Sequence, residues 1–267
     1  MISIENLCFS YSDGEPNIFH QLNLILGDVP RTCILGAEGA GKSTLAKLLK
    51  GLLTPQAGRI ADGDGNALAT SAIGYVAADP DDNLVGITVD DDIIFGLENL
   101  GLSATEVRQR LASAIQWTGL NGMEKRLIQS LSGGEKQKVA LASMMALGAR
   151  VLVCDEAATM LDPPARIMLS ECLRSLNTQH GAIVIEMTSL LLDALDADKI
   201  VLLERGNICF QGTPADFLAH PCGQQWLGAS RGVLGLLREL DQCGVDGAIE
   251  RGHLRNARSF IQSLLNG

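Results

Sequence analysis

The sequence of 267 residues predicts an α/β fold with a mostly parallel core sheet. Short apolar runs at residues 151–154, 182–185 and 199–203 are predicted as strands buried on both faces, which is typical of parallel sheets. Stretches with helical periodicity separate these runs, and the longest covers residues 90–128. Strands that alternate with helices are typical of α/β domains, and a helical insert is expected near the middle.

The first fifty residues are predicted to supply two more strands, a glycine-rich loop and a helix. Residues 2–9 and 18–26 are expected to be strands joined by a turn at residues 12–17. A brief apolar strand at residues 32–35 leads directly into the loop. The helix is expected from residue 43 to residue 50, because its leucines fall on one face.

Composition and charge narrow the class of protein. Hydrophobic residues make up 46% and charged residues 19% of the chain, which is enough for a buried core. The net charge of -10 is opposite in sign to that of a typical nucleic-acid binder, so no nucleic-acid partner is expected. The seven cysteines form no C-x-x-C pair, which gives no support to a disulfide framework or a structural zinc site. No apolar stretch reaches the roughly 20 residues of a membrane span, and a soluble cytoplasmic chain is expected.

The pattern changes after Pro221. Two amphipathic helices are expected, one near residues 233–240 and one near residues 254–265. The chain is therefore predicted to have a main domain over residues 1–221 and a small helical appendix over residues 222–267. The apolar faces of the appendix must pack against the main domain or against a second subunit.

The glycine-rich loop at residues 36–43 fits the pattern G-x-x-x-x-G-K-[ST]. In such a loop, backbone N–H groups turn toward phosphates, and the next helix adds the positive end of its dipole. Lys42 is predicted to reach the β- and γ-phosphates and Ser43 to bind Mg²⁺. The alternative is a glycine turn with a surface lysine. The predicted nucleotide contacts are Gly36, Ala37, Glu38, Gly39, Ala40, Gly41, Lys42, Ser43 and Thr44.

The apolar run at residues 151–154 ends in two acids, Asp155 and Glu156. An acid at the end of a buried strand can hold hydrated Mg²⁺, and the next acid can polarise an attacking water. This pattern predicts metal binding by Asp155 and catalysis by Glu156, with Lys42 as the second catalytic group. Solvated acids at the end of a strand are the alternative.

A second glycine-rich segment, Leu131-Ser132-Gly133-Gly134-Glu135, lies between these two motifs. Ser132 is a good helix N-cap, and the glycines after it form a nest of amides. With these motifs in this order, the chain resembles an ATP-binding-cassette (ABC) ATPase from residue 2 to about residue 220. We call residues 131–135 the signature segment.

The resemblance implies a P-loop NTPase fold with an antiparallel β subdomain and a helical subdomain at about residues 83–145, and it implies ATP and Mg²⁺ as cofactors. It also implies a second ABC ATPase subunit, whose ATP is covered by Ser132, Gly133, Gly134 and Glu135. Tyr11 matches the residue whose ring stacks on adenine, although a lone tyrosine before a turn is more often a packing residue. Asp162 matches a loop that connects the two sites of the dimer.

Residues 73–83 and 88–99 are similar to the ATPases of energy-coupling-factor (ECF) importers for vitamins and metal ions, as is the short helical appendix. That resemblance implies an integral membrane coupling subunit and a substrate-binding membrane subunit as partners. It implies a peripheral position at the cytoplasmic face of the cell membrane. The acidic cluster at residues 79–92 is then either a solvated loop or a docking surface for arginines of the coupling subunit.

Two positions depart from the family pattern. The family has a glutamine that contacts Mg²⁺ and the attacking water where this chain has Ala78, and a switch histidine where it has Ser189. His180 lies at the other end of the same predicted strand, so it is no substitute. The loss of one positioned catalytic group typically costs ~10²–10³-fold in rate. We therefore expect slow hydrolysis at this chain's own site.

The leading hypothesis is a heterodimer in which the intact signature segment completes the site of a fully equipped partner. The alternatives are the homodimeric ATPase of another ABC importer, an ordinary site in which Glu156 alone positions the water, a non-transport ABC protein acting on nucleic acid, and a regulatory module without turnover. The single P-loop and the negative net charge argue against an ABC protein that acts on nucleic acid. The acids at 155 and 156 argue against a regulatory module without turnover. The transported substrate is not encoded, because in this family the ATPase does not touch it.

Overall fold

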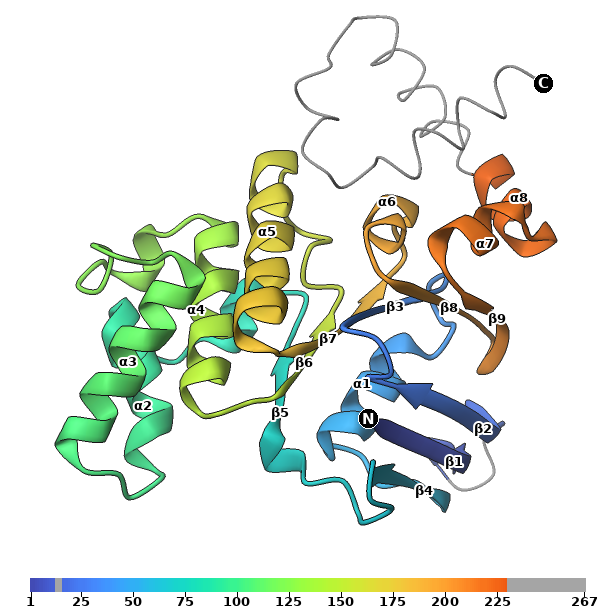
Figure 1. Ribbon diagram of the computed structural model, residues 1–267, viewed down its shortest axis with the longest axis horizontal. Coiled ribbons are helices and arrows are strands. Elements are labelled where there is room, and N and C mark those ends of the chain that lie inside the picture. Colours follow the sequence, from blue (N-terminus) through green and yellow to red (C-terminus); the bar gives the residue numbers. More distant parts are fainter. Residues whose placement is uncertain (13–15, 230–267) are drawn as a thin grey trace, which may run out of the picture.

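The computed structural model describes residues 1–12 and 16–229, which form two sheets and the helices around them (Figure 1). The larger sheet has six strands in the order β5-β6-β7-β3-β8-β9. All its neighbouring pairs are parallel except β8 and β9, which are antiparallel. Its strands are β3 (Arg31–Leu35), β5 (Ile73–Val76), β6 (Val151–Asp155), β7 (Ile183–Thr188), β8 (Lys199–Glu204) and β9 (Asn207–Gly212).

The smaller sheet is antiparallel, with the order β2-β1-β4. Its strands are β1 (Ile2–Phe9), β2 (Phe19–Leu26) and β4 (Ala57–Asp62). Helix α1 (Lys42–Lys50) packs between the two sheets, because its buried leucines join one apolar cluster with residues of both. Burial of this cluster fixes the axis of α1 and, with it, the direction in which the loop before α1 opens.

The other face of the large sheet is covered by helices. α4 (Gly133–Ala146) and α5 (Pro163–His180) pack over β5, β6 and β7, whereas α6 (Leu191–Leu195) and α7 (Pro214–Ala219) pack over β3 and β8. α8 (Pro221–Ala229) follows α7. Short 3₁₀ turns occur at η1 (Thr70–Ala72), η2 (Pro80–Asn83) and η3 (Ile128–Ser130).

Three helices form a group at one side of the large sheet, away from the small sheet, and α4 connects this group to the sheet (Figure 1). These are α2 (Val89–Glu98), α3 (Ala104–Thr118) and α4, and they enclose an apolar cluster of their own. Each begins with a capping box, in which a Ser or Thr side chain and an acid three residues later satisfy the first-turn amides.

The predicted α/β fold, with its parallel core, antiparallel sheet and helical insert, is confirmed. All five residues of β3 and of β6 are buried, which explains why these strands lack polar alternation. The helical stretch at residues 90–128 is two helices, because Gly101 adopts a left-handed φ of 65° and Ser103 caps a new helix. Strand β9 was not predicted, and its residues are all exposed or half-buried.

The expected turn at residues 12–17 lies partly, and the two expected C-terminal helices lie entirely, outside the described residues. The boundary between residues 221 and 222 and the limits of the helical subdomain remain predictions. No helix in the part of the chain that the structure describes is long and apolar enough to cross a membrane.

Candidate nucleotide-binding site

The loop at residues 36–41 connects β3 to α1 and depends on its glycines. Gly39 and Gly41 have φ values of 75° and 105°, which favour glycine. A Cβ on Gly36 would lie 2.5 Å from the carbonyl oxygen of Leu203, so this position also excludes a side chain. No side chain caps the start of α1, and no acid lies in its first turn. The first-turn amides can therefore bind an anion such as phosphate.

Lys42 is buried, with 4% of its surface exposed, and its ammonium group lies inside the loop. Nζ donates to the carbonyl oxygens of Gly36 at 2.8 Å and Ala37 at 3.0 Å. It also forms an ion pair with Oε1 of Glu156 at 3.0 Å. The structure thus brings together the two residues that the sequence analysis predicts as catalytic.

Asp155 ends β6 and is 5% exposed. Its Oδ1 accepts a hydrogen bond from Oγ of Ser43 at 2.9 Å, and its Oδ2 accepts one from the hydroxyl of Tyr75 at 2.9 Å. Tyr75 is not among the site residues predicted from the sequence. The signal lay in the strand order, since β5 is the direct neighbour of β6 and pairs Tyr75 with Val153.

The oxygens of Ser43 and Asp155 fit Mg²⁺. This ion prefers oxygen ligands and usually takes only one or two of them from protein, with phosphates and water supplying the rest. Among the described residues there is no group of three or more His, Cys, Asp or Glu side chains that could form a complete metal cage. The donor set therefore suits a metal ion that arrives with the nucleotide.

Glu156 has a φ of 53°, which is rare for a residue with a side chain and costs about 1 kcal/mol or more. Its N–H donates to the carbonyl oxygen of Met187 at 2.9 Å. Its Oε2 accepts a hydrogen bond from Oγ1 of Thr159 at 3.2 Å. These bonds hold the turn after β6 in a conformation that lets the Glu156 carboxylate reach Lys42.

Tyr11 is 54% exposed, and its ring packs edge-on against Phe9 at a centroid distance of 5.2 Å. Its hydroxyl lies 3.2 Å from Oγ1 of Thr44, in the first turn of α1. The structure therefore places Tyr11 beside the predicted phosphate site with an accessible ring. Its role as the partner of the adenine ring stays a prediction.

The signature segment belongs to the helical group rather than to the loop of Lys42. Ser132 and Glu135 form the capping box of α4, in which the Ser132 N–H donates to Oε2 of Glu135 at 2.8 Å. A Cβ on Gly134 would lie 2.7 Å from Cβ of Ala165, so glycine lets α4 approach α5 closely. Asp162 caps α5 through the N–H of Ala165 at 3.0 Å.

The backbone around Ala78 is tied to α4 by a buried amide. Nε2 of Gln137, a fully buried residue, donates to the carbonyl oxygens of Ala77 at 3.0 Å, Ala78 at 3.3 Å and Ala157 at 3.2 Å. Gln137 is not among the site residues predicted from the sequence. Its amide links the segment at position 78 to the residue after Glu156.

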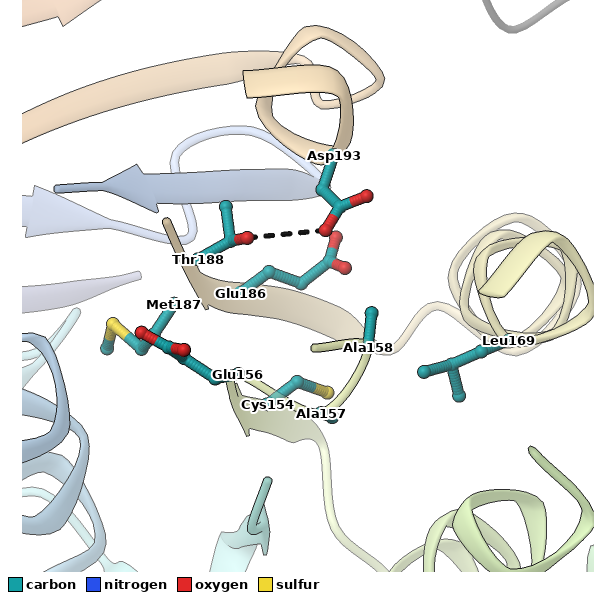
Figure 2. Close-up of a pocket in the computed structure, with 9 residues that line it drawn as sticks. All are labelled: Cys154, Glu156, Ala157, Ala158, Leu169, Glu186, Met187, Thr188 and Asp193. Carbon is teal, nitrogen blue, oxygen red and sulfur yellow. Dashed lines mark hydrogen bonds between the residues drawn. The ribbon is translucent and has the colours of Figure 1, made fainter. Parts of the chain in front are cut away.

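Ser189 follows β7 beside a pocket that contains three carboxylates: Glu156, Glu186 and Asp193. Figure 2 shows the Glu186 and Asp193 carboxylates directed toward each other, and Oγ1 of Thr188 donates to Asp193 at 3.2 Å. The pKa of Asp193 is raised to about 6, mainly by burial and in part by the charge of Glu186.

Comparisons with known proteins identify the family of this chain. The family model described as ABC transporter matches residues 19–159. The energy-coupling factor transporter ATP-binding protein EcfA of Syntrophomonas wolfei is 34% identical over 253 residues, which cover 92% of this chain and 93% of that protein. EcfA1 of Latilactobacillus sakei is 37% identical over 234 residues, which cover 85% of this chain and 82% of that protein.

A solved structure agrees with the sequence relatives. Clostridium perfringens cbiO1, described as part of the ABC transporter complex cbiONQ, matches with a TM-score of 0.77 and 28% identity. The match covers 89% of this chain and 98% of that one. The comparisons confirm the predicted class, an ABC ATPase that binds and hydrolyses ATP. Within this class, the chain belongs to the energy-coupling factor transporter ATP-binding proteins.

Proposed function

We propose that this ECF-type ATPase works as the catalytically weakened half of a heterodimer, in a transporter that imports a vitamin or a transition-metal ion. One observation carries the proposal. The groups proposed to bind phosphate and metal are assembled around Lys42 and Asp155, while Ala78 and Ser189 lack the polar and cationic groups that the family pattern has there.

The proposed roles in this site follow from the contacts. Lys42 and the amides of the loop neutralise the phosphates, and Tyr11 offers its exposed ring to the base. Ser43 and Asp155 hold Mg²⁺, which neutralises phosphate charge when it is bound with ATP. Glu156 orients the attacking water and accepts its proton.

The proposed weakness has two sources. The methyl group of Ala78 cannot orient the attacking water, and the Ser189 hydroxyl cannot carry positive charge to the γ-phosphate. Each loss costs ~10²–10³-fold in rate, and the two do not add because they act on one transition state. ATP binding is expected to survive, because its main groups are present.

The partner ATPase would use this chain's signature segment, whose capping box is complete. The coupling subunit would dock near α2, at the cytoplasmic face of the membrane. Support for that surface comes from Val85, Ile87 and Phe95, which are 69%, 73% and 56% exposed. Not every acid of the cluster at residues 79–92 can take part, because Asp90 and Asp92 are buried.

Those two buried acids serve the local fold. Asp92 accepts hydrogen bonds from the N–H groups of Val85 and Gly86 and from Oγ of Ser143. Asp90 pairs with Lys125. The exposed acids are Asp79, Asp81, Asp82 and Asp91, and of these Asp81 already forms an ion pair with Lys136.

The test is to tag this chain in its native cells, purify the complex in detergent and identify its subunits. We expect one copy of this chain, one motif-complete ABC ATPase and membrane proteins. In that complex, Ser189→His with Ala78→Gln is expected to raise ATP turnover, because a second site becomes competent. Recovery of this chain as the complex's only ATPase, or hydrolysis by the purified chain alone at ordinary transporter rates, would overturn the heterodimer proposal.

A further inference from the structure

Tyr75 contacts the candidate metal site from a strand that carries none of the predicted site residues. Its hydroxyl donates to Oδ2 of Asp155 at 2.9 Å, while Ser43 donates to Oδ1. We infer that Tyr75 is a positioning residue, which fixes the orientation of the Asp155 carboxylate for Mg²⁺. This inference rests on the proposed role of Asp155 as a metal-binding residue.

The two hydrogen bonds act on different carboxylate oxygens and come from different elements. A carboxylate held at only one oxygen can still rotate about its Cβ–Cγ bond, whereas donors at both oxygens fix its plane. Ser43 is itself a proposed Mg²⁺ ligand, so its hydroxyl must serve the metal as well. Tyr75 is then the donor that orients Asp155 without being a ligand.

Tyr75 is suited to this task because its hydroxyl has little freedom. The strand is paired with β6 in register, with Tyr75 opposite Val153. The half-buried ring packs against the apolar cluster that contains α1. A phenol has two side-chain torsions, so strand pairing and ring packing together place its oxygen.

None of the three residues that follow Tyr75 could orient the Asp155 carboxylate in its place. After it come Val76, Ala77 and Ala78, whose side chains have no hydrogen-bonding group. Tyr75 is therefore the side chain through which the end of β5 acts on Asp155. Partners that orient metal ligands in this way typically contribute 10–100-fold to metal affinity or activity.

The test uses the purified full chain and the Tyr75→Phe variant, which keeps the ring and removes only the hydroxyl. ATP binding is measured by calorimetry at increasing Mg²⁺ concentrations and again in excess EDTA. We expect the Mg²⁺ concentration for half-maximal enhancement of ATP affinity to rise about 10-fold in the variant. Affinity for ATP in EDTA is expected to stay within twofold of the wild type.

Two comparisons separate positioning from general support of the fold. Thr118→Val removes a buried hydroxyl from α3, which donates to the carbonyl oxygen of Ala114 instead of Asp155, and the Mg²⁺ midpoint of this variant is expected to remain that of the wild type. In an Asp155→Asn background, Tyr75→Phe is expected to have no further effect on the midpoint, because the carboxylate that it orients is gone.

An unchanged Mg²⁺ midpoint in Tyr75→Phe would overturn the inference while leaving the proposed metal site intact. An equal loss of affinity with and without Mg²⁺ would also overturn it, since the hydroxyl would then support the fold alone. If wild-type binding did not respond to Mg²⁺ at all, the proposed metal role of Asp155 would fail first, and this inference with it.

Discussion

The ammonium group of Lys42 lies 3.0 Å from the Glu156 carboxylate, so the cation and the base of the site are paired with each other. Two loop carbonyls, those of Gly36 and Ala37, accept the lysine's other hydrogen bonds. An ammonium group has three donors, and these three partners use them all. A phosphate oxygen must therefore replace one of the partners, which makes the Glu156 charge a competitor of ATP.

The first prediction concerns the variant Glu156→Gln, which removes this charge and keeps the shape of the side chain. ATP affinity is expected to rise several-fold, because a neutral amide holds Lys42 less strongly than a carboxylate does. The remaining hydrolysis is expected to fall by ~10²–10³-fold, because the proposed base is lost. Calorimetry and phosphate release measure the two effects.

Glu171→Gln is the matched control, since Glu171 is an exposed residue of α5. It is expected to change neither quantity. If Glu156→Gln hydrolysed ATP at the wild-type rate, Glu156 would not be the catalytic base.

The second prediction tests the buried amide of Gln137, which donates to three backbone carbonyls. Gln137→Leu leaves those acceptors without this donor and is expected to lower the free energy of unfolding by about 1–3 kcal/mol. Hydrolysis is also expected to fall, because Ala157 directly follows Glu156. Urea unfolding and phosphate release check this.

For comparison, Gln116→Leu alters an exposed glutamine of α3. Its unfolding free energy is expected to change by no more than about 0.5 kcal/mol. Equal effects of the two substitutions would show that the three carbonyls find other donors.

Sequence patterns predicted the site's local parts because each is a contiguous motif. The phosphate loop must follow a strand and start a helix, and the acids at 155 and 156 must end a strand, so spacing along the chain is sufficient. The buried strands β3, β6 and β8 were recognisable from their continuous apolar residues.

The missed contacts depend on which strands are neighbours. Tyr75 and Asp155 are 80 positions apart and meet because β5 adjoins β6. The periodicity of a strand does not reveal which strands are its neighbours in the sheet. In addition, β5 has only four residues, which makes it hard to recognise from the sequence. Gln137 was not predicted for a related reason, since its three acceptors lie in two segments that are distant from it in the sequence.

The third prediction concerns Arg31, a buried cation in β3 that forms ion pairs with Glu186 in β7 and Asp196 after α6. Burial alone lowers the pKa of Arg31, but the two carboxylates more than reverse this effect, so its net pKa is raised. Arg31→Met leaves both acids without this partner. The free energy of unfolding is expected to fall by about 3–5 kcal/mol, as measured by urea titration.

The matched control is Arg59→Met, which breaks an exposed ion pair with Glu5. Because water screens that pair, its unfolding midpoint is expected to match that of the wild type. If Arg31→Met also unfolded at the urea midpoint of the wild type, the buried ion pairs of Arg31 with Glu186 and Asp196 would add no net stability.

The last prediction is a pH dependence that originates at Asp193. The pKa of this carboxyl in the folded chain is about 6, raised from 3.8 mainly by burial. Because the folded pKa is the higher one, the protonated carboxyl stabilises the fold fully below pH 4, and this contribution is lost as the pH rises to about 6. A shift of this size corresponds to about 3 kcal/mol.

Asp193→Asn tests this, because the amide is neutral at every pH and resembles the protonated acid in shape. The stability of the variant relative to the wild type is expected to increase by about 3 kcal/mol between pH 4 and pH 7, measured by urea unfolding at each pH. Asp196 has a lowered pKa and therefore the opposite dependence, but it is present in both proteins and cancels in the difference. A difference that stays constant with pH would show that Asp193 titrates normally in the folded chain.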